Sequence, residues 1–269
     1  MDDSEPKGRV LIIAGSDSGG GAGIQADIKS VTAMGGYAAT AITAVTVQNT
    51  LGVSAVHPVP LDIIRGQIEA VLSDIGADVI KTGMLGTSEV VALVVECLQA
   101  CDVPIPLVVD PVMVATSGDA LVDAGAEAAI RDRLLPLASL VTPNIPEAEK
   151  LTGLVVEDIA GQLEAANRLI EMGAKAALVK GGHLKGQAVT DVLVSTRGME
   201  LFDRPRLPGR NTHGTGCTLA SAIAGLLADG APLHDAVRRA GDYLHEAIAR
   251  APGFGAGHGP VNHAWVTRP

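Results

Sequence analysis

Residues 10–47 read VLIIAGSDSGGGAGIQADIKSVTAMGGYAATAITAVTV, and they contain a complete strand–loop–helix–strand unit. The apolar run 10–14 predicts a strand, the glycines within 15–23 predict a loop, and the spacing of 22–34 predicts a helix. A second β-branched strand is predicted at 39–47. Short β-branched strands that alternate with helices are typical of a parallel sheet covered by helices.

The same alternation continues to residue 180 and then changes. Further strands are predicted at 79–82, 107–110, 140–142 and 177–180, and helices at 61–75, 88–100, 124–135 and 159–172 and from 146 onward. A short strand at 54–59 is expected outside the main sheet. Segments 189–195 and 200–204 predict a β-hairpin, so the sheet should end with antiparallel strands. Helices at 216–228 and 233–250 follow. We find no linker or repeat, which predicts one domain over 1–269 with a flexible segment 1–8.

Composition narrows the class of partner. The chain has 269 residues, a net charge of −10 and only 2% aromatic residues, which disfavours nucleic acid as a partner. No apolar run approaches the roughly 18 residues that span a membrane, and the charged start does not resemble a secretory signal. Three cysteines make no disulfide framework. We therefore expect a cytoplasmic protein that binds small molecules.

The segment Asn211-Thr212-His213-Gly214-Thr215-Gly216-Cys217 leads directly into a helix of small residues. Its two glycines allow a tight turn, and the helix start adds unpaired N–H groups and the positive end of the helix dipole. This combination predicts an anion site, most simply for a phosphoryl group in transfer. A thiol at a helix N-terminus is expected to have a lowered pKa, so Cys217 is predicted to act as a base.

Polar or flexible residues follow every predicted strand of the parallel sheet. They are Gly15–Gly23, Gln48–Thr50, Thr82–Met84, Asp110–Met113, Thr142–Glu147 and Lys180–His183. Because ligands bind beyond the carboxyl ends of the strands in such sheets, we expect one continuous site there.

Two familiar interpretations of the glycine loop fail. A dinucleotide-binding loop needs a carboxylate about 20 residues later, and residues 35–46 contain none. A P-loop needs Lys followed by Ser or Thr, whereas Gly23 is followed by Ile24 and Gln25. The loop is instead expected to allow close approach of substrate, with Asp27 within reach of a ligand.

Asp110 and Glu147, each just past a different strand, are predicted to hold Mg²⁺ directly or through water, with Asn144 assisting. The alternative for Glu147 is a helix N-terminal carboxylate. Lys180, at a strand end, is a candidate for binding phosphate.

The assembled motifs resemble those of the hydroxymethylpyrimidine/phosphomethylpyrimidine kinases of thiamine biosynthesis, within the ribokinase-like superfamily. The resemblance runs almost end to end, and its most specific parts are Gly20–Asp27, Val47–Thr50, Lys81–Leu85, Lys180–His183 and Asn211–Cys217. It implies a three-layer α/β/α sandwich with a mostly parallel sheet and an antiparallel edge. It also implies phosphoryl transfer from Mg²⁺-bound ATP to 4-amino-5-hydroxymethyl-2-methylpyrimidine and then to its monophosphate, and commonly a homodimer.

The resemblance also assigns roles to individual residues. It implies substrate binding by Gly15, Asp27, Gln48, Met84 and Val112, metal binding by Asp110 and Glu147, nucleotide binding by Asn144, Lys180, Thr212 and His213, and an anion hole at Gly214, Thr215 and Gly216 with Cys217 as base. Most ribokinase-like sugar kinases carry Asp where this chain has Cys217, and many relatives place Lys where this chain has Thr116. Segments 115–120 and 205–210 are candidates for closing over the site.

Two other functions remain open from the sequence. A pyridoxal or pyridoxine kinase shares the fold and also phosphorylates a ring-borne hydroxymethyl group, although Gln48, Met84 and Cys217 favour the pyrimidine. A second phosphorylation would separate the two, because pyridoxal offers no counterpart. A ligand-binding module on a kinase scaffold would bind ATP without turnover.

Overall fold

The computed structural model describes residues 8–114, 118 and 121–267. Within them the chain forms one nine-stranded sheet in the order β3-β2-β1-β4-β5-β6-β7-β8-β9. The strands are β1 Arg9–Asp17, β2 Tyr37–Asn49, β3 Gly52–Pro58, β4 Val79–Thr82, β5 Leu107–Val109, β6 Leu140–Val141, β7 Ala177–Val179, β8 Ala188–Ser195 and β9 Gly198–Pro205. The predictions for 1–7, for Thr116 and for most of 115–120 lie outside the described residues.

The helices follow the predicted positions closely. They are α1 Gly23–Ala33, α2 Leu61–Ala70, α3 Ser88–Gln99, α4 Ala124–Ala129, α5 Ile145–Thr152, α6 Ile159–Glu171, α7 Thr215–Ala228 and α8 Leu233–Ala249. The predicted helix 61–75 changes to a π-helical turn at Val71–Ile75, and 124–135 changes at Ile130–Leu134 and ends in a 3₁₀ turn, Leu135–Leu137. No helix in the described part of the chain is both long and apolar enough to span a bilayer.

The middle of the sheet is parallel and both of its edges are antiparallel. Strands β2, β1, β4, β5, β6 and β7 pair in parallel, and β8 and β9 form the predicted hairpin at one edge. The expectation that segment 54–59 stays outside the sheet is wrong, because β3 pairs antiparallel with β2. Only Thr50 and Leu51 separate these two strands, and so short a connection returns the chain alongside β2 as a hairpin.

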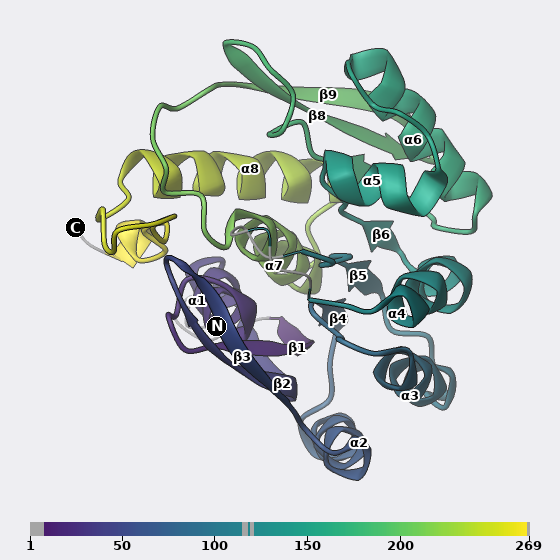
Figure 1. Ribbon diagram of the computed structural model, residues 1–269. Coiled ribbons are helices and arrows are strands. Elements are labelled where there is room, and N and C mark those ends of the chain that lie inside the picture. Colours follow the sequence, from purple (N-terminus) through teal and green to yellow (C-terminus); the bar gives the residue numbers. More distant parts are fainter. Residues whose placement is uncertain (1–7, 115–117, 119–120, 268–269) are drawn as a thin grey trace, which may run out of the picture.

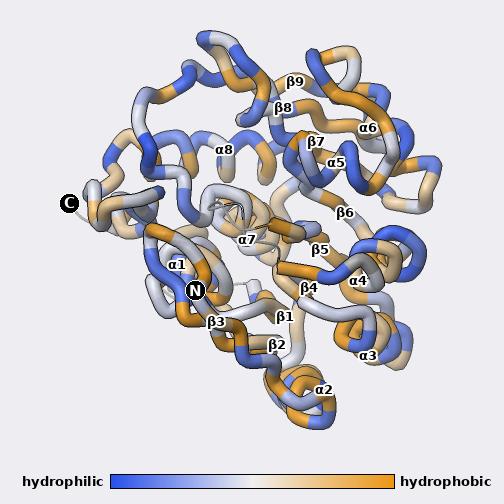
Figure 2. The backbone as a smooth tube through the Cα atoms, in the orientation of Figure 1, coloured by the Kyte–Doolittle hydropathy of each residue, from blue (hydrophilic) through white to orange (hydrophobic). Residues whose placement is uncertain are grey.

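Two cores cover the two faces of the sheet, and β1 contributes to both. Leu11 and Ile13 pack with the core under α2–α6, whereas Ile12 and Ala14 pack with the core under α1, α7 and α8. This alternation follows the two-residue period of a strand. Figure 1 shows the two helix groups on opposite sides of the strands, and Figure 2 shows the apolar strands between them. The predicted three-layer α/β/α sandwich is confirmed.

Candidate active site

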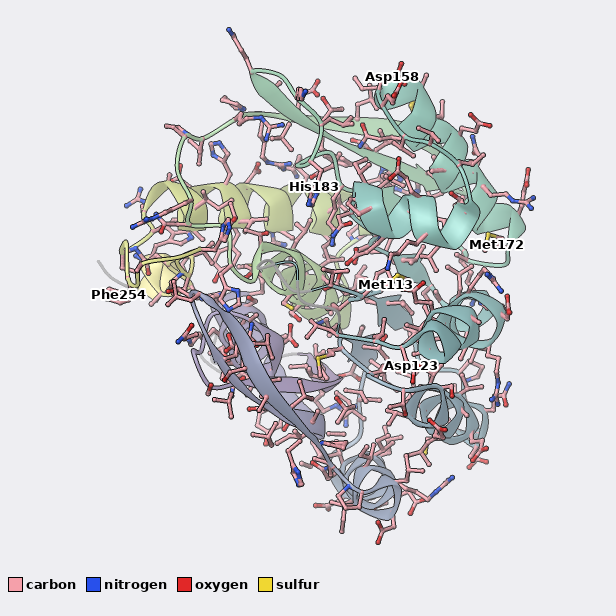
Figure 3. The ribbon with its side chains drawn as sticks, viewed as in Figure 1. Met113, Asp123, Asp158, Met172, His183 and Phe254 are labelled. Carbon is pink, nitrogen blue, oxygen red and sulfur yellow. The ribbon has the colours of Figure 1, made fainter. Side chains whose placement is uncertain are left out.

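A cavity of about 670 Å³ opens where the carboxyl ends of the parallel strands meet the N-terminus of α7. Of the predicted site residues, all but Asp27 lie in its wall: Gly15, Gln48, Met84, Asp110, Val112, Asn144, Glu147, Lys180, Thr212, His213, Gly214, Thr215, Gly216 and Cys217. Met113 and His183 line it as well, and Figure 3 shows both in the region between α5, α7 and α8. The volume suits one or two small ligands.

The first turn of α7 forms the predicted anion-binding end of the cavity. Gly214 is the N-cap, with φ of 77°, a conformation that favours glycine. A Cβ atom on Gly214 would lie 1.8 Å from the carbonyl oxygen of Gly21, so the turn also packs directly on the glycine loop. The N–H groups that follow belong to the helix start, which has no intrahelical acceptors for them. The positive end of α7 therefore points into the cavity.

Cys217 lies half-buried in that first turn, but the pKa of its thiol is not lowered as predicted. Burial raises the pKa of Cys217 to about 12, even though Lys81 and a hydrogen bond from the Gly23 N–H favour the thiolate. The expected lowering of the pKa by the helix end is therefore wrong, because loss of water around the sulfur outweighs the favourable charges.

Asp110 and Lys180 form a largely buried ion pair beside Gly216, at the start of α7. The Lys180 Nζ lies 3.0 Å from Asp110 Oδ1, which also accepts a hydrogen bond from Thr142. A Cβ on Gly216 would lie 3.2 Å from the Lys180 Nζ, so glycine lets the ammonium approach the helix start. Asp110 Oδ2 is buried without a hydrogen-bond partner among the described residues. This oxygen is available for a cation.

Glu147 and Asn144 form a reciprocal capping box at the start of α5. Asn144 Oδ1 accepts from the Glu147 N–H at 3.0 Å, and Glu147 Oε2 accepts from the Asn144 N–H at 2.8 Å. Burial raises the pKa of Glu147 to about 7, opposed by Lys180 and reinforced by Asp110. The capping role that the sequence left open is thus present, and the Met113 N–H gives the Glu147 carboxylate a further hydrogen bond.

The two carboxylates fit a magnesium ion held mainly by its nucleotide. No group of three or more His, Cys, Asp or Glu side chains within the described ranges is arranged as a metal cage. Mg²⁺ in phosphoryl-transfer sites is commonly bound by one or two carboxylates together with water and substrate phosphates. Asp110, with its unpaired buried oxygen, and the neighbouring Glu147 meet that description.

Gly15, Met84 and Val112 form a largely apolar part of the cavity wall. A Cβ on Gly15 would lie 3.1 Å from the Met84 Cε, so a ring could slide over Gly15 only because no side chain is present. Gln48 is half-buried, and its Oε1 accepts a hydrogen bond from Thr46. Val112 and Met84 add apolar surface to the wall. Apolar walls with one amide group are suited to an aminopyrimidine.

Asp27 does not reach the cavity, which corrects the expectation that it contacts the ligand. Its side chain is completely buried between α1, β4 and α7. Asp27 Oδ1 lies 2.9 Å from the Lys81 Nζ and accepts a hydrogen bond from Ser221 at 2.6 Å. The Asp27 side chain faces the helix α7 rather than the cavity, because α1 and α7 pack side by side on the same face of the sheet.

Asp17 is a functional candidate that sequence reasoning missed. Its carboxylate accepts hydrogen bonds from the N–H groups of Gly19, Gly21 and Ala22, and Asp17 Oδ2 lies 2.8 Å from His213 Nε2. The chain's own carboxylate thus fills the glycine loop and ties it to the α7 turn. An Asp two residues before a glycine run is a turn signal that could have been recognised. Because His213 is tied to Asp17, its ring stabilises the loop as well as lining the cavity.

Comparison with known proteins finds relatives that match almost the whole chain. The family model described as phosphomethylpyrimidine kinase matches residues 17–262. The chain belongs to the phosphomethylpyrimidine kinase family. A hydroxymethylpyrimidine/phosphomethylpyrimidine kinase of Streptomyces coelicolor is 47% identical over 96% of this chain and 94% of its own length. A bifunctional thiamine biosynthesis protein of Geobacter sulfurreducens is 52% identical over 96% of this chain, and the chain spans 52% of that longer protein.

Among solved structures, the chain is similar in fold to a phosphomethylpyrimidine kinase and to pyridoxal kinases. A phosphomethylpyrimidine kinase of Clostridium difficile has a TM-score of 0.80 and 42% identity, covering 90% of this chain and all of its own. A pyridoxal kinase of Staphylococcus aureus, in complex with AMP-PCP and pyridoxal, has a TM-score of 0.89 and 35% identity over 97% of this chain and 95% of its own. The higher sequence identity thus lies with the pyrimidine kinases.

Proposed function

We propose that the chain phosphorylates 4-amino-5-hydroxymethyl-2-methylpyrimidine, and then its monophosphate, with ATP as donor, in thiamine biosynthesis. The observation that carries this proposal is that one continuous cavity is lined both by Gly15 and the apolar Met84 and by the start of α7 at Gly214–Cys217. Family membership and the identity to bifunctional pyrimidine kinases support the same substrates. Such an arrangement holds acceptor and phosphoryl donor in line, which is the main requirement of phosphoryl transfer.

In the first step, the hydroxymethyl oxygen bonds to the γ-phosphorus of ATP while the bond from that phosphorus to the bridging oxygen breaks. Gln48 orients the aminopyrimidine, and Met84 and Val112 pack on its ring. The α7 N–H groups at Gly214–Gly216 stabilise the transferred group, and Lys180 neutralises phosphate charge. The hydroxyl proton passes to the Cys217 thiolate. In the second step the acceptor is a phosphate oxygen that is already ionised, so no base is required.

Asp110 and Glu147 would hold Mg²⁺, with Asn144, Thr212 and His213 on the nucleotide side. The ion would neutralise charge on the β- and γ-phosphates. Lys180 pairs with Asp110 Oδ1 and leaves Oδ2 without a partner among the described residues, so the pair orients the carboxylate for the cation. We place the reaction in the cytoplasm, where ATP is available and a reducing environment keeps the three thiols free.

The experiment is an ATP-consumption assay with the aminopyrimidine alcohol and pyridoxal in parallel, followed by mass analysis of the products. Two successive phosphate additions to the pyrimidine support the proposal. A single addition that is faster on pyridoxal would instead identify a vitamin B6 kinase. ATP binding without any product would leave only a ligand-binding role.

A further inference from the structure

Lys81 lies in the middle of the sheet with no access to solvent. Its side chain is 0% exposed, and it is a charged residue in β4, a strand whose other residues are also buried. Burying an ammonium is costly unless a carboxylate accompanies it, and Asp27, also 0% exposed, lies 2.9 Å away. Burial opposes the charged form of Lys81, but the Asp27 carboxylate, together with the acidic groups of Cys217 and Asp110, outweighs burial and raises the pKa of Lys81.

The pair is not fully satisfied by its neighbours. Ser221 and Lys81 both bond Asp27 Oδ1, whereas Asp27 Oδ2 is buried without a partner among the described residues. Burial raises the pKa of Asp27, and the Lys81 ammonium opposes that rise. A completely buried ion pair with an unpaired oxygen is a poor source of stability compared with apolar packing. A contribution to stability therefore does not explain why the Lys81–Asp27 pair is present.

The pair lies directly behind the wall of the cavity beside Cys217. Ser221 is four residues after Cys217 in α7, so the two side chains share one face of the helix. Gly83 lines the cavity, and a Cβ on it would lie 3.0 Å from the Lys81 Nζ. Only a glycine therefore separates the ammonium from the cavity.

We propose that Lys81 is a positioning residue whose buried charge, held in place by Asp27, stabilises negative charge at the Cys217 end of α7. The charged groups that act on the thiol come from four elements: Lys81 of β4, Asp27 of α1, Asp110 after β5 and Lys180 after β7. Asp110 and Lys180 are paired with each other at 3.0 Å. Lys81 is the largest favourable contribution to the Cys217 thiolate, and Asp27 opposes it. The inference rests on the proposed role of Cys217 as proton acceptor.

The test measures the reactivity of Cys217 without substrate or turnover. In a background with Cys97→Ala and Cys101→Ser, iodoacetamide labels only Cys217, and mass analysis follows the rate between pH 7 and 10. Because the thiolate is the reactive form, the rate reports its population. We expect Lys81→Met to slow labelling about tenfold at a given pH, since one pKa unit is a factor of ten. At pH 7, Asp27→Asn should accelerate labelling several-fold, because the acidic groups of Cys217 and Asp110 still favour the charged form of Lys81.

Opposite directions are the decisive result, because a merely structural role loosens the cavity in both variants and shifts both rates the same way. If both variants label faster, or neither changes, the proposal is overturned. Should Lys81→Met fail to fold, Asp27→Asn is compared with Lys81→Met/Asp27→Asn, which removes the ammonium without leaving a lone carboxylate. Slower labelling of the double variant supports the proposal, and equal rates overturn it. As a control, all variants should be labelled at the same rate in urea, where the chain is unfolded and the Cys217 thiol is exposed to water.

Discussion

Cys217 is subject to two opposing influences, burial and a cluster of nearby charges. Burial raises the pKa of its thiol to about 12, whereas the Lys81 ammonium and the Gly23 N–H favour the thiolate. The ionised thiol is thus a minor species near neutral pH. Cys217 can accept a proton from an alcohol only as the thiolate, so its surroundings must stabilise that anion before the proton is transferred. For a substrate that is already ionised, the same side chain contributes little.

The two phosphorylation steps should therefore respond differently to loss of the thiol. We expect Cys217→Ala to lower kcat for the aminopyrimidine alcohol by about 100-fold, within the usual range for general-base catalysis, and kcat for the monophosphate only slightly. The wild-type rate of the first step should also rise from pH 7 to 9, because the required thiolate increases over that range. Product mass at fixed times measures both steps. Equal losses in the two steps would contradict this division of roles.

At the scale of elements, the site depends on how the start of α7 meets the glycine loop. Gly214 packs on the Gly21 carbonyl, while Asp17 joins that loop to His213. The C-terminal segment adds further contacts, because the His213 N–H donates to Gly259 and His263 Nε2 shares a hydrogen bond of 2.9 Å with Thr218. The glycine loop and the C-terminal segment, both far from α7 in sequence, thus set the direction of its N-terminal end.

Gly214 and Gly230 offer a matched comparison at the two ends of α7. Both have positive φ, 77° and 85°, but a Cβ meets the Gly21 carbonyl at the first and nothing within 4 Å at the second. We expect Gly230→Ala to lower the free energy of unfolding by about 1 kcal/mol and Gly214→Ala by about 3 kcal/mol. Gly214→Ala should also abolish turnover, whereas Gly230→Ala should remain active. Urea unfolding and the ATP assay measure both effects, and inactivity of both variants would refute the argument.

His263 makes the contact between the C-terminal segment and α7 sensitive to pH. Burial lowers the pKa of His263 from 6.5 to about 4, so the unfolded chain binds a proton that the folded protein does not. The free energy of unfolding should therefore fall as pH drops below 6.5, by about 2 kcal/mol between pH 7.5 and pH 5 from this residue alone. In His263→Gln this part of the pH dependence should disappear. Urea unfolding of both proteins at the two pH values tests it; an identical difference in both would exclude His263 as the cause.

At the scale of the whole molecule, the antiparallel edge formed by β2 and β3 leaves apolar side chains exposed. Along β2 the buried Ala44 and Thr46 alternate with Val45 and Val47, which are 47% and 61% exposed. Leu51 at the hairpin turn is 69% exposed. Exposed valines on a sheet surface are typical of a protein–protein contact. We propose that this face pairs two copies of the chain, in keeping with the homodimer that the resemblance implies.

Val47→Asp should then convert a dimer to a monomer, because the substitution places a charge in an apolar contact. Val155, which is 74% exposed, offers a matched control, and Val155→Asp should leave the dimer intact. Sedimentation velocity at micromolar concentration distinguishes the species. A monomeric wild-type protein, or a dimeric Val47→Asp variant, would show that this face has no such role.

Much of the architecture was predictable from local sequence. The alternation of β-branched runs and helical spacing determined the central parallel strands, and β8–β9 followed from a hairpin pattern. Because parallel strands share one carboxyl edge, residues as distant as Gln48, Asp110 and Lys180 were expected to meet, and they line one cavity. The edge position of β3 was missed because the strands predicted at 39–47 and 54–59 left residues 48–53 between them, whereas β2 and β3 are longer and only Thr50 and Leu51 join them as a hairpin.

The sequence by itself determined the order of elements and which side chains lie at the strand ends, because both depend on local periodicity. Only the tertiary structure decided what those side chains experience. Asp27 is sealed against Lys81, which is 54 residues away, and Asp17 bonds His213 across 196 residues. The proton affinity of Cys217 likewise follows from burial and from charges on four separate elements. Solvation and charge balance arise from packing in three dimensions, and no local pattern in a chain encodes them.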